Sequence, residues 1–434
     1  MCEKVFQIVP TVQNYAWGKI GLNSKVAELI SNAYPEIEID KSQTYAELWM
    51  GTHPNGPSVI KNTGELLKSY ISKNPELLTT DIAAKYGDLP FLFKVLSIRK
   101  ALSIQAHPDK KLAEYLFQNF PDKYKDDNHK PEMAIALTPF EGLCGFRPHE
   151  NIKNNIQKYP EIIDAIGKEI VDEFMDITKD TQSKNVLDIE RNKNALKNLY
   201  RSLMEQNHTI IKTQLDKLIS RISKIDPNPP KGTLDEVLIR IEKQYPGDVG
   251  IFSIFLLNFV SLKPGEGLYL AANEPHAYVS GDCIECMAAS DNVVRAGLTP
   301  KFKDVETLVD MLTYTCKSAD NQIVSGSSYL NSTSTVLYNP PIEEFSILCT
   351  TLSSDGIKSE TFEGVKGPSI ILTTEGKGRI IYNEKIFDTC AGSVFFVGAN
   401  TSITLETSSN KTIFYRAYSE LSKIQSFDNI NENE

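Results

Sequence analysis

The feature that most constrains the fold is a helical segment that interrupts an otherwise β-rich chain. From about residue 150 to 245 the sequence is rich in Lys, Asn, Asp and Glu, and its apolar residues recur at helical spacing. Such spacing places the apolar side chains on one face of each helix, so that the helices can pack together as a bundle. The positions that follow the pattern are Ile162, Ile166, Ile170, Phe174, Leu196, Leu199, Leu203, Ile211, Leu215, Leu218 and Ile222.

The end of the helical segment is marked by residues 226–232, DPNPPKG, because consecutive prolines prevent helical hydrogen bonding. The following TLDEVLIRIEKQ predicts a last helix over 233–244. Thr233 is its expected N-cap, and Glu236 stands at the capping-box position.

The segments on either side of the helical part alternate short apolar runs with turn residues, which predicts strands. Each half alone would leave strands unpaired, so we expect one β-barrel that the helical segment interrupts. After 330, short strands with Gly turns predict a second β unit. The expected fold class is therefore mainly β with an α insertion. The expected ranges are 1–150 for the first part of the barrel, 151–249 for the helical insertion, 250–329 for the second part, and 330–434 for a C-terminal β domain.

Short helices are also expected within the β-rich parts. They are predicted over 23–31, in a turn after Asp109, and over 304–316, where DVETLVDMLTYTC reads as one helix. The polar end, residues 426–434, is expected to be frayed.

Composition limits the class of function. The formal net charge of -10 disfavours nucleic-acid binding, which depends on neutralising phosphates, so we expect a small-molecule partner. The start of the chain lacks the apolar region of a signal peptide, and the longest apolar run, GIFSIFLLNFV, is too short to span a membrane. Seven cysteines, an odd number, do not form a disulfide framework, so we expect a reducing compartment, the cytosol.

Four residues form a candidate metal site. Gln105 and His107 stand two apart, so in a strand their side chains share one face. Glu132 and His276 lie at the ends of other strand-like runs. Two imidazoles, one amide and one carboxylate would leave a bound Zn²⁺ with a net charge near +1 and Lewis acidity toward a carbonyl or hydroxyl. The alternative for each His is a hydrogen-bonded structural role.

The stretch from 272 to 302 offers a second donor set. Cys283 and Cys286 form a C-x-x-C spacing, but no second close Cys pair follows, and the context is β rather than the helix start of a redox motif. We therefore expect both thiols to be buried apolar residues. Glu285, between Ile284 and Cys286, would be partly desolvated, which suits a general base; a salt bridge is the alternative.

The same stretch carries two cations, Arg295 and Lys301. An Arg and a Lys close to a metal site suit a phosphate group, because Arg forms bidentate hydrogen bonds and Lys supplies a point charge. A solvated surface pair is the alternative. The sequence contains no G-x-G-x-x-G or P-loop pattern, so it does not predict nucleotide binding.

Six ordered blocks resemble one family. They are QNYAWG, YAELWMGTHPNGPS, LPFLFKVLSIRKALSIQAHPDK, NHKPEMAIALTPFEGLCGF, LYLAANEPHAYVSGDCIECMAASDNVVRAGLTPKF and GSVFFVGAN. Together they look like type I mannose-6-phosphate isomerase, a zinc enzyme built on cupin-type (jelly-roll) β-barrels. Most of the blocks lie between residues 13 and 302 outside the helical segment.

The resemblance implies the residues of the site. The family's zinc ligands fall on Gln105, His107, Glu132 and His276, with one zinc ion per chain, and its active-site Arg falls on Arg295. Its other pocket residues fall on Trp17, Lys94, Ser103, Lys130, Tyr278, Glu285 and Lys301.

The implied reaction converts mannose 6-phosphate to fructose 6-phosphate through a cis-enediol. In this hypothesis Glu285 is the base, Arg295 stabilises the enediolate or assists proton transfer, and zinc polarises or positions the sugar oxygens. Lys301 contributes to phosphate recognition, with Ser103 and Lys130 as further contacts. The family also implies supply of mannose for GDP-mannose synthesis. We expect a cytoplasmic monomer that binds a phosphosugar and neither nucleic acid nor membrane.

Three other functions are alternatives to the isomerase. A non-catalytic cupin that binds sugar phosphates would be favoured if Glu285 or Arg295 were missing, and both are present. A redox or structural zinc protein predicts reactive thiols at Cys283 and Cys286. A cupin dioxygenase is also conceivable, but a donor set of Gln and Glu beside phosphate-ready cations fits a phosphosugar better.

Overall fold

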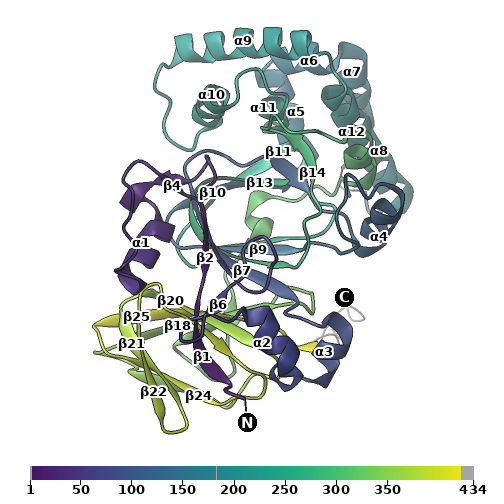
Figure 1. Ribbon diagram of the computed structural model, residues 1–434. Helices are drawn as coiled ribbons and strands as arrows, with labels where there is room; N and C mark the ends of the chain where they lie inside the picture. Colours follow the sequence, from purple (N-terminus) through teal and green to yellow (C-terminus); the bar gives the residue numbers. More distant parts are fainter. Residues whose placement is uncertain (1, 182, 422–434) are drawn as a thin grey trace.

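The middle of the molecule is an eleven-stranded sheet (Figure 1). The computed structural model describes residues 2–181 and 183–421, so the expected fraying of 426–434 lies outside the described residues. The main path of this sheet consists of β15 (Ile323–Val324), β12 (Gly267–Leu270), β9 (Glu132–Ala136), β13 (His276–Ala288), β7 (Phe91–Ile98), β5 (Glu47–Met50) and β2 (Thr11–Gln13). Branching strands are β10 (Phe140–Phe146), β11 (Leu257–Leu262), β8 (Ile104–Ala106) and β14 (Val294–Gly297).

The long strand β13 joins the parts of the chain that lie before and after the helical segment. It pairs antiparallel with β7, where Glu285 stands opposite Lys94, and with β9, where Glu285 stands opposite Ala134. Its first residue, His276, pairs with Gln105 of β8. Strands far apart in sequence thus share one sheet, and the side chains of the candidate site are brought to it from both parts.

The C-terminal unit consists of two further sheets. The eight-stranded sheet contains β16 (Ser327–Ser328), β17 (Thr335–Tyr338), β18 (Ser346–Ser353), β25 (Lys411–Tyr418), β20 (Ser369–Glu375), β23 (Val394–Val397), β1 (Val5–Val9) and β6 (Val59–Ile60). The four-stranded sheet contains β19 (Ser359–Phe362), β24 (Ile403–Thr407), β21 (Lys377–Tyr382) and β22 (Lys385–Cys390). A small separate pair is formed by β3 (Lys19–Ile20) and β4 (Thr44–Tyr45).

Two N-terminal strands belong to the C-terminal sheet. Figure 1 shows β1 and β6, drawn in dark colours, among the yellow and green strands at the bottom of the molecule. β1 pairs with β23, with Val5 opposite Val397, and on its other side with β6. The expected range of 1–150 for the first part of the barrel did not anticipate this exchange, and the four expected ranges stay predictions.

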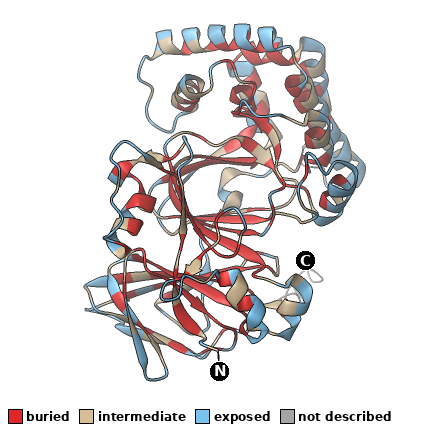
Figure 2. Ribbon diagram, in the orientation of Figure 1, coloured by how far each residue is buried: buried red, intermediate tan, exposed pale blue. Residues whose placement is uncertain are grey.

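Two apolar cores lie between these sheets, whose strands carry many buried residues (red in Figure 2). One lies between the two C-terminal sheets and includes Ile371, Phe395, Ile380 and Leu405. The other lies on the opposite face of the eight-stranded sheet, where residues such as Ile370, Leu372 and Phe396 pack against the central sheet, including Ile284 and Cys286 of β13. The face of β13 that carries Ile284 and Cys286 is therefore buried in this core.

The helical segment forms the helices at the top of Figure 1. They are α5 (His149–Lys158), α6 (Glu161–Ile166), α7 (Lys168–Ile177), α8 (Val186–Met204), α9 (His208–Ile225) and α10 (Leu234–Gln244). The run of apolar residues spaced by four from Ile162 to Phe174 crosses a break at Gly167, whose φ of 112° ends α6. Thr233 caps α10 as expected, but Glu236 accepts a hydrogen bond from Gly232 N instead of completing the capping box.

The remaining helices are short. They are α1 (Lys25–Ala33), α2 (Leu67–Lys73), α3 (Thr80–Tyr86), α4 (Lys110–Asn119), α11 (Gly250–Ser253) and α12 (Val305–Met311), with 3-10 turns at Gly21–Asn23, Pro75–Leu77 and Ala319–Gln322. The helix predicted to follow Asp109 is α4, and the Asp109 side chain caps it by accepting from Leu112 N. The expected helix over 304–316 was too long: α12 ends at Met311, because Leu312 is extended and Tyr314 adopts a φ of 53°.

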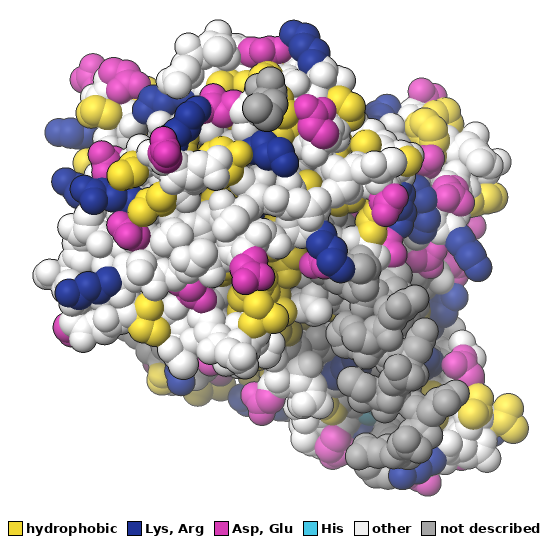
Figure 3. All heavy atoms as spheres, turned by 90° about the horizontal axis from the view of Figure 1, so that it is seen from below, with side chains coloured by type: hydrophobic (Ala, Val, Ile, Leu, Met, Phe, Trp, Pro, Cys, Tyr) yellow, Lys and Arg dark blue, Asp and Glu magenta, His cyan; other side chains and the backbone are white. Residues whose placement is uncertain are grey.

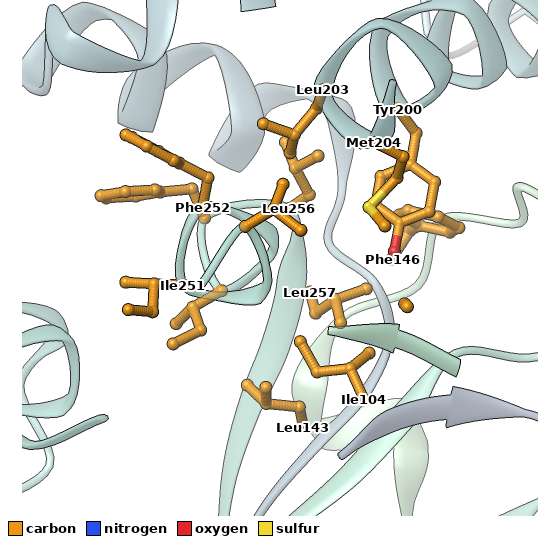
Figure 4. Packing of buried hydrophobic residues seen from close by; sticks show 14 of the residues in the cluster. Ile104, Leu143, Phe146, Tyr200, Leu203, Met204, Ile251, Phe252, Leu256 and Leu257 are labelled. Atoms are coloured by element: carbon orange, nitrogen blue, oxygen red, sulfur yellow. The ribbon is translucent and has the colours of Figure 1, made fainter. Parts of the chain in front are cut away.

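The helical insertion and the barrel share one apolar core (Figure 4). Tyr200 of α8 lies beside Phe146 of β10, and Leu203 of α8 lies near Leu256. The same cluster includes Ile251 and Phe252 of α11 and continues to Ile104 of β8. Burial of each such side chain stabilises the fold by about 1.5–3 kcal/mol. The insertion is therefore packed onto the strands that carry the candidate ligands.

The surface seen from below carries acidic and basic side chains interspersed, where grey atoms do not cover it (Figure 3). Among the described residues, no helix combines the length and the apolar character that crossing a bilayer requires.

Candidate metal centre and active site

His107, Glu132 and His276 converge at the ends of three strands. β8 leads into His107, while Glu132 begins β9 and His276 begins β13. Their potential ligand atoms all lie within 4.8 Å of one another, and all three side chains are buried. Glu132 Oε1 lies 3.4 Å from His107 Nε2, and Glu132 Oε2 lies 3.5 Å from His276 Nε2.

The protonation states of these groups suit a divalent metal. His107 Nδ1 donates to Asn292 O at 2.7 Å, and His276 Nδ1 donates to Glu274 O at 3.0 Å. Because carbonyls only accept, Nδ1 carries the proton in the neutral form of each ring, and that form leaves a lone pair on Nε2. Those two nitrogens and Glu132 Oε2 are buried without a hydrogen-bond partner in the described part of the chain. Three orphaned buried acceptors facing one point fit a metal ion.

Burial and neighbouring charges favour a neutral His107 and an ionised Glu132. Burial lowers the pKa of His107 to about 4, so its imidazole stays neutral. Burial raises the pKa of Glu132, but His107 and Lys130 outweigh it and hold that pKa well below its usual range. Lys130 Nζ lies 3.4 Å from Glu132 Oε1.

Gln105, the fourth predicted ligand, stands beside this group. Its backbone pairs with both His276 and Arg295, so Gln105 and Arg295 occupy facing positions of β8 and β14. Its side chain is half-buried, and its Oε1 accepts a hydrogen bond from Ser103 Oγ at 3.4 Å. The structure thus places Ser103, Gln105 and Arg295 next to one another at this end of the sheet.

A buried charge network lies on the adjoining strands. Lys94 Nζ donates to Glu285 Oε2 at 3.0 Å and lies 3.4 Å from Glu47 Oε2. Burial lowers the pKa of Lys94, but the Glu285 and Glu47 carboxylates raise it above its ordinary value. One lysine therefore serves two buried carboxylates.

The shared lysine leaves Glu285 incompletely neutralised. Burial raises its pKa; Lys94 opposes this, while the charges of Glu132 and Glu47 add to it, and the net effect is a raised pKa. Tyr278, on the same strand, has a buried Oη without a hydrogen-bond partner in the described residues. Burial, followed by the Glu285 charge, raises the pKa of Tyr278 well above its ordinary value. A carboxylate with a raised pKa beside a metal group is suited to proton transfer.

Sequence reasoning missed Glu47 and Trp49 of β5. Trp49 Nε1 donates to Glu47 Oε2, and the Lys94 ammonium lies 4.9 Å from the centre of the Trp49 ring. Trp49 and Lys94 are opposite each other in the β5–β7 ladder. The signal was present: Glu47 stands between apolar residues in YAELWMG, the pattern that singled out Glu285.

Arg295 and Lys301 line one cavity of about 320 Å³ together with Lys123 and Tyr124. Arg295 is half-buried, and burial lowers the pKa of its guanidinium. Within residues 2–181 and 183–421, no carboxylate lies within ion-pair distance of Arg295 or Lys301. Both cations are available to an anionic ligand.

Trp17 lies beside the apolar cluster that contains Tyr278. Its carbonyl accepts hydrogen bonds from Arg99 N and Lys100 N, both at 3.0 Å, and its ring packs against the cluster that contains Tyr278. The structure therefore brings Trp17 near the pocket residue Tyr278.

The two thiols face opposite sides of β13. Cys286 joins the core against the C-terminal sheet, whereas Cys283 joins the core that contains Tyr278. Both are free and fully buried, and burial raises the pKa of Cys283 well above its ordinary value. Side chains on opposite faces of a strand cannot bind one ion together.

Three family models match the chain. They are the type I phosphomannose isomerase catalytic domain over residues 5–149, its helical insertion domain over 165–257, and its C-terminal region over 335–384. The matches follow the order of the β-rich, helical and β-rich parts described above.

Curated relatives and solved structures that resemble this chain come from the same family as the matching models. Mannose-6-phosphate isomerase from Candida glabrata is 43% identical over 96% of this chain and 99% of its own length. The enzyme from Saccharomyces cerevisiae is 44% identical over 97% and 100%. A phosphomannose isomerase variant from Salmonella typhimurium superposes with a TM-score of 0.81 at 30% identity, covering 96% of this chain and 100% of that one. A mannose 6-phosphate isomerase bound with zinc and yttrium has a TM-score of 0.80, the same identity and the same coverage. The expected fold class is confirmed.

Proposed function

The chain belongs to the type I phosphomannose isomerase family, and from that membership we propose that it interconverts mannose 6-phosphate and fructose 6-phosphate with one Zn²⁺ per chain. The observation that carries the proposal is the buried His107, Glu132 and His276 group beside the Lys94 and Glu285 pair. The relatives bear the name of this activity, and one neighbouring structure binds zinc.

Gln105, His107, Glu132 and His276 would hold the metal. The donor set of two neutral imidazoles, one carboxylate and one amide leaves net positive charge on the ion. When bound, the ion supplies Lewis acidity toward the sugar's oxygens.

The proton transfer is assigned to Glu285. After ring opening, its carboxylate takes the C2 proton, a cis-enediol forms, and the proton is returned to C1. Because its pKa is raised, the carboxylate binds a proton more strongly than an exposed one would, which suits a group that must accept the C2 proton. Lys94 holds it in place, and Tyr278 lies on the same strand.

The cations orient the substrate. Arg295 stabilises the negative charge that develops on the enediolate, and Lys301 recognises the phosphate, with Ser103 and Lys130 as further contacts. Trp17 forms part of the pocket wall. In the reverse direction the product is mannose 6-phosphate, which feeds the supply of GDP-mannose in the cytosol, and the chain works as a monomer.

The test is conversion of mannose 6-phosphate by purified protein before chelation, after chelation, and after zinc is restored. Activity that disappears with the chelator and returns with zinc supports the isomerase and the metal together. Absence of activity in zinc-loaded protein would favour a non-catalytic cupin that binds sugar phosphates.

A further inference from the structure

The segment that ends the helical insertion, residues 244–250, contacts two loops of the proposed active site. The first contact is with the loop before Ser103. Tyr245 Oη donates to Ala101 O at 2.5 Å, and Ala101 N donates to Gln244 Oε1 at 2.8 Å. The end of the insertion is thus bonded to the chain that leads into β8.

The second contact is made by Asp248. Its Oδ1 accepts hydrogen bonds from Gly250 N and Leu298 N, both at 2.7 Å, and its Oδ2 accepts one from Thr299 N at 3.2 Å. Thr299 Oγ1 in turn accepts from Lys301 N at 3.1 Å. A continuous set of hydrogen bonds therefore leads from a carboxylate of the insertion to the backbone of Lys301.

The loop needs such an external restraint. Leu298 is buried with a φ of 54°, a conformation that costs a non-glycine residue free energy. Just before it, Gly297 packs so closely on Gly250 that a Cβ added at Gly297 would lie 2.5 Å from Gly250 Cα. A strained residue persists only where its surroundings hold it, and the Asp248 carboxylate binds the amide of that residue and of the next.

We infer that Asp248 is a positioning residue: through Leu298 and Thr299 it places Lys301 for recognition of the substrate phosphate. This inference rests on the proposed function. Arg295 is held independently, because it pairs with Gln105 in the β14–β8 ladder before the strained residue is reached. Loss of Asp248 should therefore weaken phosphate binding and spare the chemical step.

The experiment uses the full-length, zinc-loaded protein with Asp248→Asn, which keeps the shape of the side chain and removes its charge. We expect the KM for mannose 6-phosphate and the inhibition constant of inorganic phosphate to rise together by roughly tenfold. The kcat should stay within about threefold of wild type, since Arg295 and Glu285 are not displaced. Thr299→Val, which removes only the acceptor for Lys301 N, should act in the same direction and supplies a second variant if the first is unstable.

The matched control is Leu218→Ala. Leu218 is fully buried in the insertion core on α9, so this change destabilises the same part of the chain while the side chains of residues 244–250 stay as in wild type. It should leave the inhibition constant of phosphate at the wild-type value. An equal rise in this control would mean that general loosening of the insertion is the cause and would overturn the inference.

A double-mutant cycle with Lys301→Ala decides whether Asp248 acts through Lys301. If it does, adding Asp248→Asn to Lys301→Ala should change KM little further, because coupled residues do not add. Additive effects, or unchanged constants in Asp248→Asn, would overturn the inference while the isomerase activity itself stands. A zinc-loaded wild-type protein without activity would instead overturn the proposed function, and this inference with it.

Discussion

At the scale of single residues, the site is governed by the sharing of one lysine between two buried carboxylates. Lys94 contacts both Glu285 and Glu47. Neither carboxylate is exposed enough for water to screen its charge fully, so each affects the pKa of the other groups. Burial is the largest cause of the raised pKa of Glu285; Lys94 lowers that pKa, and the charges of Glu132 and Glu47 raise it further.

Replacing Glu285 by Gln should reduce kcat by roughly 10²–10⁴-fold, because the proposed base is lost while the shape of the side chain is kept. Turnover is measured on protein whose zinc content matches wild type. Glu161→Gln is the matched control, since Glu161 is also buried but pairs with Arg221 in the helical insertion. Near-normal turnover of Glu285→Gln would remove Glu285 from the role of base.

Replacing Lys94 by Gln should move the acid limb of the kcat/KM profile to higher pH. Burial raises the pKa of Glu285 and Lys94 is the largest effect that lowers it, so its loss raises that pKa further. A base is active only when ionised, and a higher pKa means that it becomes protonated at a higher pH as the solution is acidified. Lys301→Gln serves as control and should change KM but not the limb. A limb that stays in place or moves to lower pH would contradict the assignment.

At the scale of elements, the two faces of β13 have different roles: one carries site residues and the other packs in an apolar core. Successive side chains of a strand point to opposite faces, so Glu285 faces the site while Ile284 and Cys286 enter the core against the C-terminal sheet. β10 and the loop before it approach the first half of β13, residues 276–281. A Cβ at Gly281 would lie 2.6 Å from Pro139 O, which leaves no room for a side chain there.

The cysteines of β13 should be inert. Substituting Cys283 or Cys286 by Ala is expected to leave kcat and zinc content at wild-type values, with a stability loss of about 1 kcal/mol for the vacated volume. In native protein, an alkylating reagent should leave both thiols unmodified by mass spectrometry, whereas all seven cysteines react in urea. Rapid alkylation of Cys283 in native protein, with loss of zinc, would instead support a zinc site formed by the thiols.

At the scale of the whole molecule, the C-terminal unit is joined to the catalytic sheet by an apolar core and by ion pairs. His129 Nε2 donates to Glu344 Oε1 at 2.7 Å, and His129 directly precedes Lys130 of the proposed site. The pair thus connects the C-terminal unit to a loop that carries an active-site cation. Burial raises the pKa of Glu344, but the hydrogen bond and charge of His129 outweigh it, so that the pKa is lowered.

Glu344→Gln should lower the free energy of unfolding by about 1–2 kcal/mol at pH 7. A carboxyl group whose folded-state pKa is lowered stabilises the protein above its ordinary pKa, and this contribution is lost as the pH falls through the lowered value. The difference between variant and wild type should therefore shrink on acidification. Urea unfolding at several pH values measures it, with Glu343→Gln, whose partner Lys85 is largely exposed, as the weaker control. A difference that grows on acidification would contradict this sign.

The sequence by itself determined the local features of this protein. Its periodicity predicted the helical insertion and a helical turn after Asp109, and the pattern at Thr233 predicted the cap of α10, because these depend on neighbours in the chain. The spacing of Gln105 and His107, and the burial of Glu285 between apolar residues, likewise pointed to the candidate site. Such patterns follow from the repeat of a helix or strand and need no knowledge of distant contacts.

Only the tertiary structure decided which distant residues meet. It placed Glu47 against Lys94, moved β1 into the C-terminal sheet, ended α12 at Met311, and bonded Asp248 to the loop of Lys301. The physical reason is that strand pairing and loop restraint depend on contacts between residues tens to hundreds of positions apart. A local pattern determines which face of a strand a side chain occupies, but not which strand lies opposite.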